Sequence, residues 1–151
     1  MNFKLAVAML SVSLAAGSAV AQMKPEDAIK FRQSGYTFMS WNMARIKANV
    51  DGTYNKEEVI KAANAIQAIA NSGMGALFIP GSEKGKGWKD TRVKPEFFTD
   101  KDGVTKVAGP FVQQANEMAK VAATGDAAAV KAQFGKLGET CKGCHDKFRG
   151  D

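Results

Sequence analysis

The sequence predicts an all-α protein that folds as an antiparallel four-helix bundle, and three observations support this prediction. Apolar residues recur at spacings of three and four along four separate segments, which is the pattern of a helix with one buried face. No segment has the alternating Val, Ile and Thr pattern of a strand, and no Asn-Gly turn marks a hairpin. Four amphipathic helices without strands pack most simply as a bundle.

The composition is that of one ordinary globular domain. The chain has 151 residues, of which 45% are hydrophobic and 24% charged, with two cysteines, one histidine and a formal net charge of +6. The apolar fraction is too high for a disordered polyelectrolyte, and two cysteines are too few for a disulfide-stabilised scaffold.

The first 21 residues differ from the rest and predict a cleaved secretory signal peptide. Lys4 is their only charged residue, apolar and small residues fill positions 5–20, and Ala19-Val20-Ala21 is a small-x-small tripeptide. A membrane anchor is the weaker alternative, because the run is somewhat short of the roughly 20 residues that a span needs. We therefore expect residues 22–151 to form one domain in the bacterial periplasm, free of the membrane, where thiols tend to be oxidised.

The first helix is predicted over residues 25–49. Pro25 suits the first turn of a helix, and the two acidic residues after it lie favourably near the positive end of the helix dipole. The expected inward face follows a seven-residue spacing with two further members, and consists of Ile29, Tyr36, Met39, Met43, Ile46 and Val50.

The second helix begins at Asn55, which forms a capping-box pattern with Glu58. Its expected buried face is Val59, Ala62, Ala63, Ile66, Ile69 and Ala70, and residues 71–73 end it. Residues 74–99 are rich in Gly and Lys and include Pro80-Gly81, so we expect a long surface connection without a regular element. Connections of this length are uncommon in small domains and often have a function.

Two further helices complete the predicted bundle. The third covers about residues 104–124, with Gly125 as its stop, and Pro110 is best accommodated if the regular helix begins just before it. Asp126 caps the fourth helix. Its apolar stripe has steps of four and three throughout, at Val130, Phe134, Leu137, Cys141, Cys144 and Phe148.

The fourth helix carries the motif that indicates chemistry, Cys141-Lys142-Gly143-Cys144-His145. C-x-x-C-H is the attachment signature of c-type haem. Residues three apart share one helix face, so Cys141 and Cys144 can both form thioethers with the vinyl groups at one edge of the porphyrin. His145 follows directly and can ligate the iron. We therefore expect one covalently attached haem c per chain, near the C-terminus.

Three other interpretations of the cysteine pair are weaker. A thioredoxin-like dithiol belongs at a strand-to-helix junction, and no strands are predicted. A disulfide that closes so small a loop removes little chain entropy. A four-coordinate zinc site needs ligands from a second cluster, and the chain has no other cysteine or histidine.

The single histidine raises the question of what faces the iron from the other side. Any second ligand has to come from an upstream helix, and the natural candidate is the helix at 25–49. There, Tyr36 occupies an expected core position, and Met39 and Met43 lie one and two turns further on. Core packing is the ordinary role of such residues, so a methionine ligand stays open at this point.

The chain resembles cytochrome c′, the class II c-type cytochromes, over essentially all of residues 22–151. The resemblance is carried by KPEDA at 24–28 with Arg32-Gln33 after it, by the Pro80-Gly81-Ser82 loop, by TRVKPE at 91–96 and by CKGCHDKFR at 141–149. It implies an antiparallel four-helix bundle, often a homodimer through the first two helices. It also implies five-coordinate, high-spin haem iron with an open, apolar distal side.

The resemblance implies roles for eight residues. They are Cys141 and Cys144 for haem attachment, His145 as proximal iron ligand, Tyr36 on the distal side, Arg32, Gln33 and Thr91 in contact with the haem, and Arg149 beside the proximal face. Physical reasoning agrees for Arg32, because an arginine on the core track needs a buried anionic group, which a haem propionate supplies. The chain departs from shorter members of the family by a Gly- and Lys-rich extension at 84–90.

Two functional classes follow. The first is a protein that binds small gaseous ligands, NO and CO, at a vacant iron position to which Tyr36 narrows the access, and that takes part in electron transfer. The second is a low-spin electron carrier with Met39 or Met43 as sixth ligand. Enzymatic turnover is not expected, because the sequence offers no distal histidine and no paired carboxylates for acid–base work.

Two surface features bear on partners. Phe31, Phe38 and Trp41 lie off the main stripe of the first helix, consistent with a homodimer through the first two helices. A basic cluster lies in the long connection and consists of Lys84, Lys86, Lys89, Arg92 and Lys94. Such a run is usually a solvated surface, and a docking patch for a redox partner protein is the less favoured alternative. Nucleic-acid binding is not expected in an exported haem protein.

Overall fold

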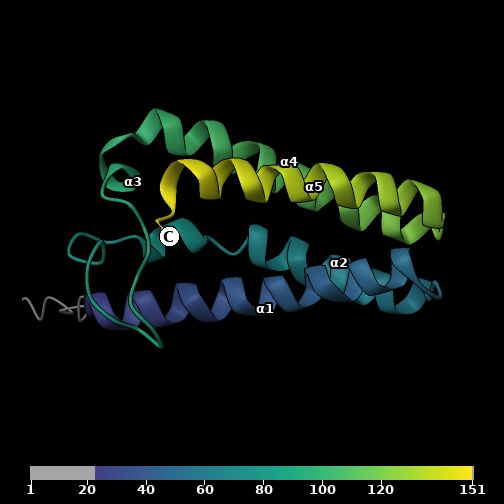
Figure 1. Cartoon of the computed structure of the whole chain (residues 1–151), viewed down its shortest axis with the longest axis horizontal. Helices are drawn as coiled ribbons and strands as arrows, with labels where there is room; N and C mark the ends of the chain where they lie inside the picture. Colours follow the sequence, from purple (N-terminus) through teal and green to yellow (C-terminus); the bar gives the residue numbers. More distant parts are fainter. Residues whose placement is uncertain (1–22, 151) are drawn as a thin grey trace, which may run out of the picture.

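Four long helices, each antiparallel to the next along the chain, form the computed structural model, which describes residues 23–150 (Figure 1). They are helix α1 (Pro25–Asp51), helix α2 (Lys56–Ala70), helix α4 (Lys101–Thr124) and helix α5 (Ala127–Phe148). The predicted four-helix bundle is therefore confirmed. The predicted signal peptide, residues 1–21, lies outside the described residues. Within residues 23–150, none of the helices combines the length and the apolar character that a membrane span requires.

The hydrophobic core receives side chains from all four long helices. Its fully buried members include Ile46, Val59, Ile66, Met118, Val130 and Leu137. Helix α5 packs extensively on α4, and α2 packs extensively on both α1 and α4, whereas α1 and α5 contact each other much less. The bundle is consequently more open between α1 and α5 than between its other neighbouring helices.

The caps of α2 and α5 form largely as the sequence predicts. Asp126 accepts hydrogen bonds from the N–H groups of the second and third residues of α5, at 2.9 and 3.1 Å. The Asn55 side chain accepts from the Glu58 N–H at 3.2 Å. The reciprocal half of the capping box is absent from this pair: the Glu58 carboxylate pairs with Arg45, and the Asn55 N–H donates to the Asn49 side chain at 2.8 Å.

The connection between α2 and α4 contains more regular structure than expected. A 3₁₀ helix, η1, covers Met74–Leu77, and a short helix, α3, covers Glu96–Thr99. Phe78 follows η1 and stacks on Phe97 of α3, with ring centroids 4.1 Å apart. The expectation of a connection without a regular element was wrong, because this aromatic contact between distant parts of the connection supports both short helices.

Helix α4 begins at Lys101 and continues through Pro110, so the expectation that the regular helix begins just before this proline was wrong. The start is set by Asp100, which accepts from the Gly103 N–H at 2.8 Å and forms an ion pair with Lys147 of α5 at 2.7 Å. A methyl group on the buried Gly103 would collide with both partners of this pair. The contact with α5 thus starts α4 upstream of the proline.

We predict that Asp100 stabilises the protein in a pH-dependent way. The Lys147 ammonium, followed by the Gly103 N–H, holds the pKa of the Asp100 carboxyl below its ordinary value. A lowered folded-state pKa contributes stability that is present above the unfolded-state value, about 3.9, and is lost as the pH falls through the folded-state value. Asp100→Ala should therefore lower the thermal unfolding midpoint at pH 7, and its difference from the parent protein should shrink below about pH 4.

The matched control is Asp102→Ala, because Asp102 is an acidic residue of the same turn without an ion pair in the described chain. Thermal melts followed by circular dichroism between pH 7 and pH 3 would measure both variants. A deficit in Asp100→Ala that stayed constant over this range would contradict the assignment.

Candidate functional site

The last turns of α5 hold the three residues of the C-x-x-C-H motif. Cys141 and Cys144 are free thiols, both partly buried, and their spacing of three places them on one face of the helix. Burial raises the pKa of each thiol, and the neighbouring Cys141 raises that of Cys144 further. The next residue, His145, is exposed. The motif thus presents two thiols and one accessible imidazole at the same part of the bundle.

Tyr36 of α1 lies across from the two cysteines. Removal of its hydroxyl from water raises its pKa to about 12, the thiols of Cys144 and Cys141 raise it as well, and the Arg32 guanidinium opposes them. The whole side chain is nevertheless 44% exposed. The expected core position of Tyr36 was therefore wrong, and its proximity to the motif is what the structure adds.

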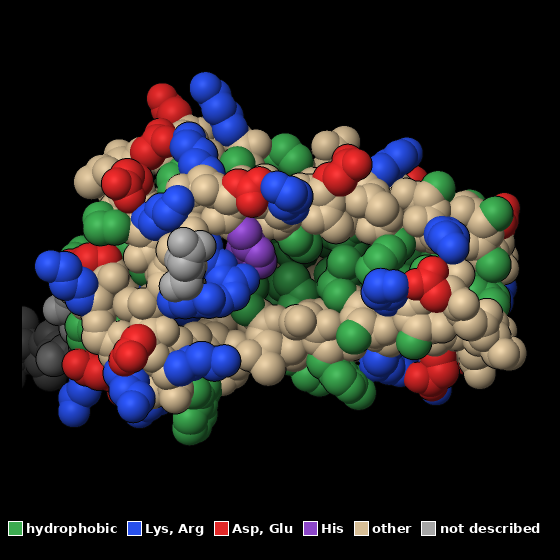
Figure 2. Space-filling view, in the orientation of Figure 1, with side chains coloured by type: hydrophobic (Ala, Val, Ile, Leu, Met, Phe, Trp, Pro, Cys, Tyr) green, Lys and Arg blue, Asp and Glu red, His purple; other side chains and the backbone are tan. Residues whose placement is uncertain are grey.

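The surface between α1 and α5 is hollowed next to His145. Figure 2 shows the single histidine at one end of this hollow, whose floor is lined by hydrophobic side chains. The hollow follows from the sparse contact between α1 and α5. A flat, largely apolar group tied to Cys141 and Cys144 would have an apolar wall to pack against.

The donor set fits a covalently attached haem. Two unpaired thiols at this spacing suit two thioether bonds, and His145 adjoins them as an iron ligand. The Nδ1 atom of His145 lies 3.4 Å from the Arg149 guanidinium, so Nε2 is the nitrogen left for the iron. No three His, Cys, Asp or Glu side chains within residues 23–150 come together as a metal cluster.

Met39 and Met43 serve the core of the bundle. Met39 is 6% exposed and belongs to the main hydrophobic cluster, and Met43 packs against the same cluster. The side chains of Met39 and Met43 therefore pack in the core, which is the ordinary role of such residues. Tyr36 lies close enough to Cys141 and Cys144 for the two thiols to raise its pKa.

The guanidinium of Arg32 is buried and joins α1 to the long connection. It donates to the Ser82 hydroxyl and carbonyl, to the Thr91 hydroxyl at 2.7 Å and to the Leu77 carbonyl at 3.3 Å, and it lies over the Phe78 ring. Neutral oxygens and an aromatic ring thus surround the guanidinium within the described residues, and its expected pairing with a buried anionic group stays a prediction. The contacts of Arg32 and Thr91 with a haem stay predictions.

Gln33 holds the extension at 84–90 against α1. Its side-chain oxygen accepts from the Trp88 N–H at 2.8 Å and from the Lys89 N–H at 3.3 Å, and its side-chain nitrogen donates to the Lys89 carbonyl at 2.8 Å. Trp88 also donates from its indole to Ser34 at 2.8 Å. The extension is thus a docked segment of the structure, and a haem contact by Gln33 stays a prediction.

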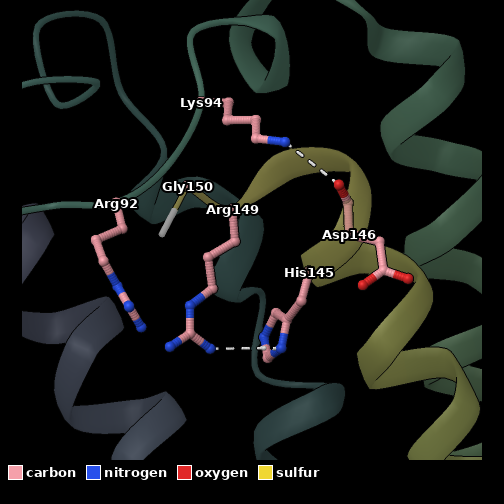
Figure 3. Close-up of a pocket in the computed structure, with 6 residues that line it drawn as sticks. All are labelled: Arg92, Lys94, His145, Asp146, Arg149 and Gly150. Carbon is pink, nitrogen blue, oxygen red and sulfur yellow. Dashed lines mark hydrogen bonds between the residues drawn. The ribbon is translucent and has the colours of Figure 1, made fainter.

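Arg92 is exposed, as the sequence predicted for the basic cluster, and Lys94 is partly buried, yet both also border the site. They line a cavity of about 460 Å³ together with His145, Asp146, Arg149 and Gly150 (Figure 3). The Lys94 N–H donates to the Phe148 carbonyl at 2.9 Å, and the Gly150 N–H donates to the Arg92 carbonyl at 2.7 Å. Sequence reasoning missed these residues because their backbone pairing with the end of α5 has no local signal.

Comparisons with known proteins agree on one family. Residues 27–149 match the family model described as Cytochrome C′. A cytochrome c′ from Rhodocyclus tenuis is 66% identical over 127 residues, which cover 83% of this chain and 96% of that protein. A solved cytochrome c′ described as having ligand-controlled dimer dissociation is 56% identical, with a TM-score of 0.84 over 87% of this chain and all of that one. A nitric oxide complex of a mutant cytochrome c′ from Alcaligenes xylosoxidans is 28% identical, with a TM-score of 0.75 over 85% of this chain and 98% of that one.

We predict that Gly87→Ala detaches the extension from α1. A methyl group at this position would lie 2.7 Å from the Gln33 side-chain oxygen and 2.8 Å from both Ile29 and the Lys30 nitrogen, so the segment has to move away. Hydrogen exchange of the Trp88 and Lys89 N–H groups should accelerate about tenfold or more, which corresponds to ~1.4 kcal/mol of lost protection.

Gly135→Ala is the matched control, because a methyl group at that helical position meets no neighbouring atom. Exchange measured by mass spectrometry or NMR would compare the two variants. Equal protection of Trp88 and Lys89 in Gly87→Ala and in the parent protein would show that Gln33 does not hold the extension.

Proposed function

Because the chain belongs to the cytochrome c′ family, we propose that it is an exported haem protein that binds the small gaseous ligands NO and CO at five-coordinate, high-spin iron. In this proposal each chain carries one haem c, bound covalently through Cys141 and Cys144 and ligated by His145. The protein also takes part in electron transfer. It binds and exchanges ligands and electrons and does not act as an enzyme.

The observation that carries the proposal is the identity of the residue opposite the motif. Tyr36 reaches the cysteines from α1, whereas Met39 and Met43 belong to the hydrophobic cluster. A neutral phenol with its pKa raised to about 12 is a poor iron ligand, since ligation by tyrosine requires the phenolate. This arrangement supports a free coordination position and disfavours the low-spin alternative with a methionine ligand.

Each residue at the proposed haem site has its own role. When bound, haem iron supplies a position that small diatomic molecules can occupy. Cys141 and Cys144 hold the group at the partly buried face of α5, and His145 orients it from the proximal side. Tyr36 narrows the access from the other side, and the apolar hollow beside it disfavours charged molecules. Uncharged diatomic ligands are the class that such a site admits.

The relatives support this choice of ligand and a dimeric state. One related structure is a nitric oxide complex of a cytochrome c′, and another is of a cytochrome c′ whose dimer dissociates under ligand control. On this chain, Phe31, Phe38 and Trp41 of α1 are 55%, 50% and 53% exposed. We propose that they contribute to a homodimer through α1 and α2, because exposed aromatic side chains on one helix are typical of an interface.

The location and the protein partner of the chain follow from its N-terminal residues and from the surface around His145. The signal-like residues 1–21 support export to the periplasm, where the mature chain works without membrane attachment. The exposed position of His145 beside basic residues supports electron exchange with a redox partner protein. Nucleic acid is not among the proposed partners.

We predict broad, high-spin optical spectra for the purified haem protein in both oxidation states. Met39→Leu and Met43→Leu should leave these spectra unchanged, because neither thioether ligates the iron in this proposal. A sharp low-spin spectrum that either substitution converted to a high-spin one would overturn the vacant-site proposal and identify the methionine ligand. Absence of haem from the denatured chain would instead overturn covalent attachment.

We also predict that Tyr36→Ala speeds the association of CO with the reduced protein, because the smaller side chain widens the approach between α1 and α5. Stopped-flow or flash-photolysis measurements would give the association rate. Phe38→Ala is a suitable control, since it removes an exposed aromatic ring of the same helix. An association rate unchanged by Tyr36→Ala would remove this residue from the account of ligand access.

A further inference from the structure

We propose that Arg92 and Arg149 form a carboxylate-binding site that holds a propionate of the attached haem. The proposal rests on covalent haem attachment as stated above, and it concerns residues of the long connection and of the chain end. It assigns to Arg92 a role in positioning the haem and to Arg32 the role of holding Arg92 in place.

The two guanidinium groups face the same cavity. Figure 3 shows the side chains of Arg92 and Arg149 extending side by side, with the His145 imidazole next to Arg149. Lys94 lines the cavity as well and donates to the Asp146 carbonyl at 3.3 Å. Three cationic residues therefore line a cavity of about 460 Å³, and two of them, Arg92 and Arg149, lie side by side in it.

These charges lack a carboxylate partner in the part of the chain that the structure describes. None of Arg92, Lys94 and Arg149 takes part in an ion pair within residues 23–150. Asp146 lines the cavity, but its carboxylate pairs with Lys142 and points away from the guanidinium groups (Figure 3). Like charges held together disfavour one another, so an anion between them is stabilising.

The backbone fixes this arrangement in advance. Residues 92–94 pair with the segment just after α5 through the bonds between Lys94 and Phe148 and between Gly150 and Arg92, with a β-bridge between Val93 and Arg149. Alternate residues of an extended segment point to the same side, so Arg92 and Lys94 share a side. A site held in place by backbone hydrogen bonds loses less entropy when it binds.

Arg32 is engaged with the long connection in the described chain. Its two terminal nitrogens carry four N–H groups, and four acceptors occupy them: two on Ser82, one on Leu77 and one on Thr91. The bond to Thr91 anchors the residue directly before Arg92. Arg32 thereby orients the segment that presents Arg92 to the cavity.

The chemistry of the attached group matches the cavity. Thioethers at Cys141 and Cys144 tie the vinyl side of the porphyrin to α5, and the two propionates lie on the side away from the vinyl groups. Their carboxylates suit the planar fork of a guanidinium, which can bind both oxygens at once. Two guanidinium groups beside the proposed iron ligand are therefore suitable partners for one of them.

The test uses the haem-loaded protein and its variants Arg92→Gln, Arg92→Lys and Arg149→Gln. Resonance Raman spectroscopy follows the propionate bending bands, whose frequency falls when a hydrogen bond to the carboxylate is lost. We expect one band to shift to lower frequency in Arg92→Gln and in Arg149→Gln, and Arg92→Lys to recover part of the shift. Arg92→Gln is decisive, because Arg149 also contacts His145.

Lys84→Gln is the matched control, since it removes one positive charge from an exposed position of the same connection. Circular dichroism would confirm that each variant is folded. Bands in Arg92→Gln identical to those of the parent and of Lys84→Gln would overturn the proposal. A parent protein without covalent haem would overturn the proposed function as well, and is recognised separately by the mass of the denatured chain.

Discussion

The buried guanidinium of Arg32 is the contact on which the arrangement around the site depends. Removing a charged group from water costs several kcal/mol, and burial accordingly lowers the pKa of Arg32. Hydrogen bonds to Ser82, Leu77 and Thr91, with the Phe78 ring beneath, offset this cost. One side chain of α1 therefore organises a connection that would otherwise be a long, polar surface loop.

The same connection, between α2 and α4, also contacts the C-terminal end of α5. Phe78 stacks on Phe97, which meets Phe148 of α5 edge to face at 5.4 Å, so an aromatic series runs from the contact with Arg32 to the end of the helix that carries the C-x-x-C-H motif. The same segment pairs by backbone hydrogen bonds with residues 148–150. The cavity beside His145 is consequently built by the connection and the C-terminal turn, two parts of the chain that are distant in sequence, and α1 holds the connection in place through Arg32.

The places where sequence reasoning failed have a common cause. Capping and periodicity predicted α2 and α5 closely, because both depend on residues a few positions apart. The predicted helix start just before Pro110 was wrong, because the ion pair between Asp100 and Lys147 starts α4 at Lys101. The position of Arg92 beside Arg149 was not predicted, because the backbone pairing of residues 92–94 with the end of α5 joins segments that are distant in sequence. In each case a contact between distant segments outweighed the local preference.

By itself, the sequence determined the fold class and the four helices and located the C-x-x-C-H motif, because helical periodicity and motif spacing act over a few residues. It also determined the family, through motifs that run from Arg32-Gln33 to Arg149. Only the tertiary structure decided that Tyr36 lies near the cysteines while Met39 and Met43 pack in the core, and that Arg92 joins Arg149 beside His145. Those outcomes depend on how far α1 stands from α5 and on which backbone segments pair, and neither distance nor pairing has a local signature.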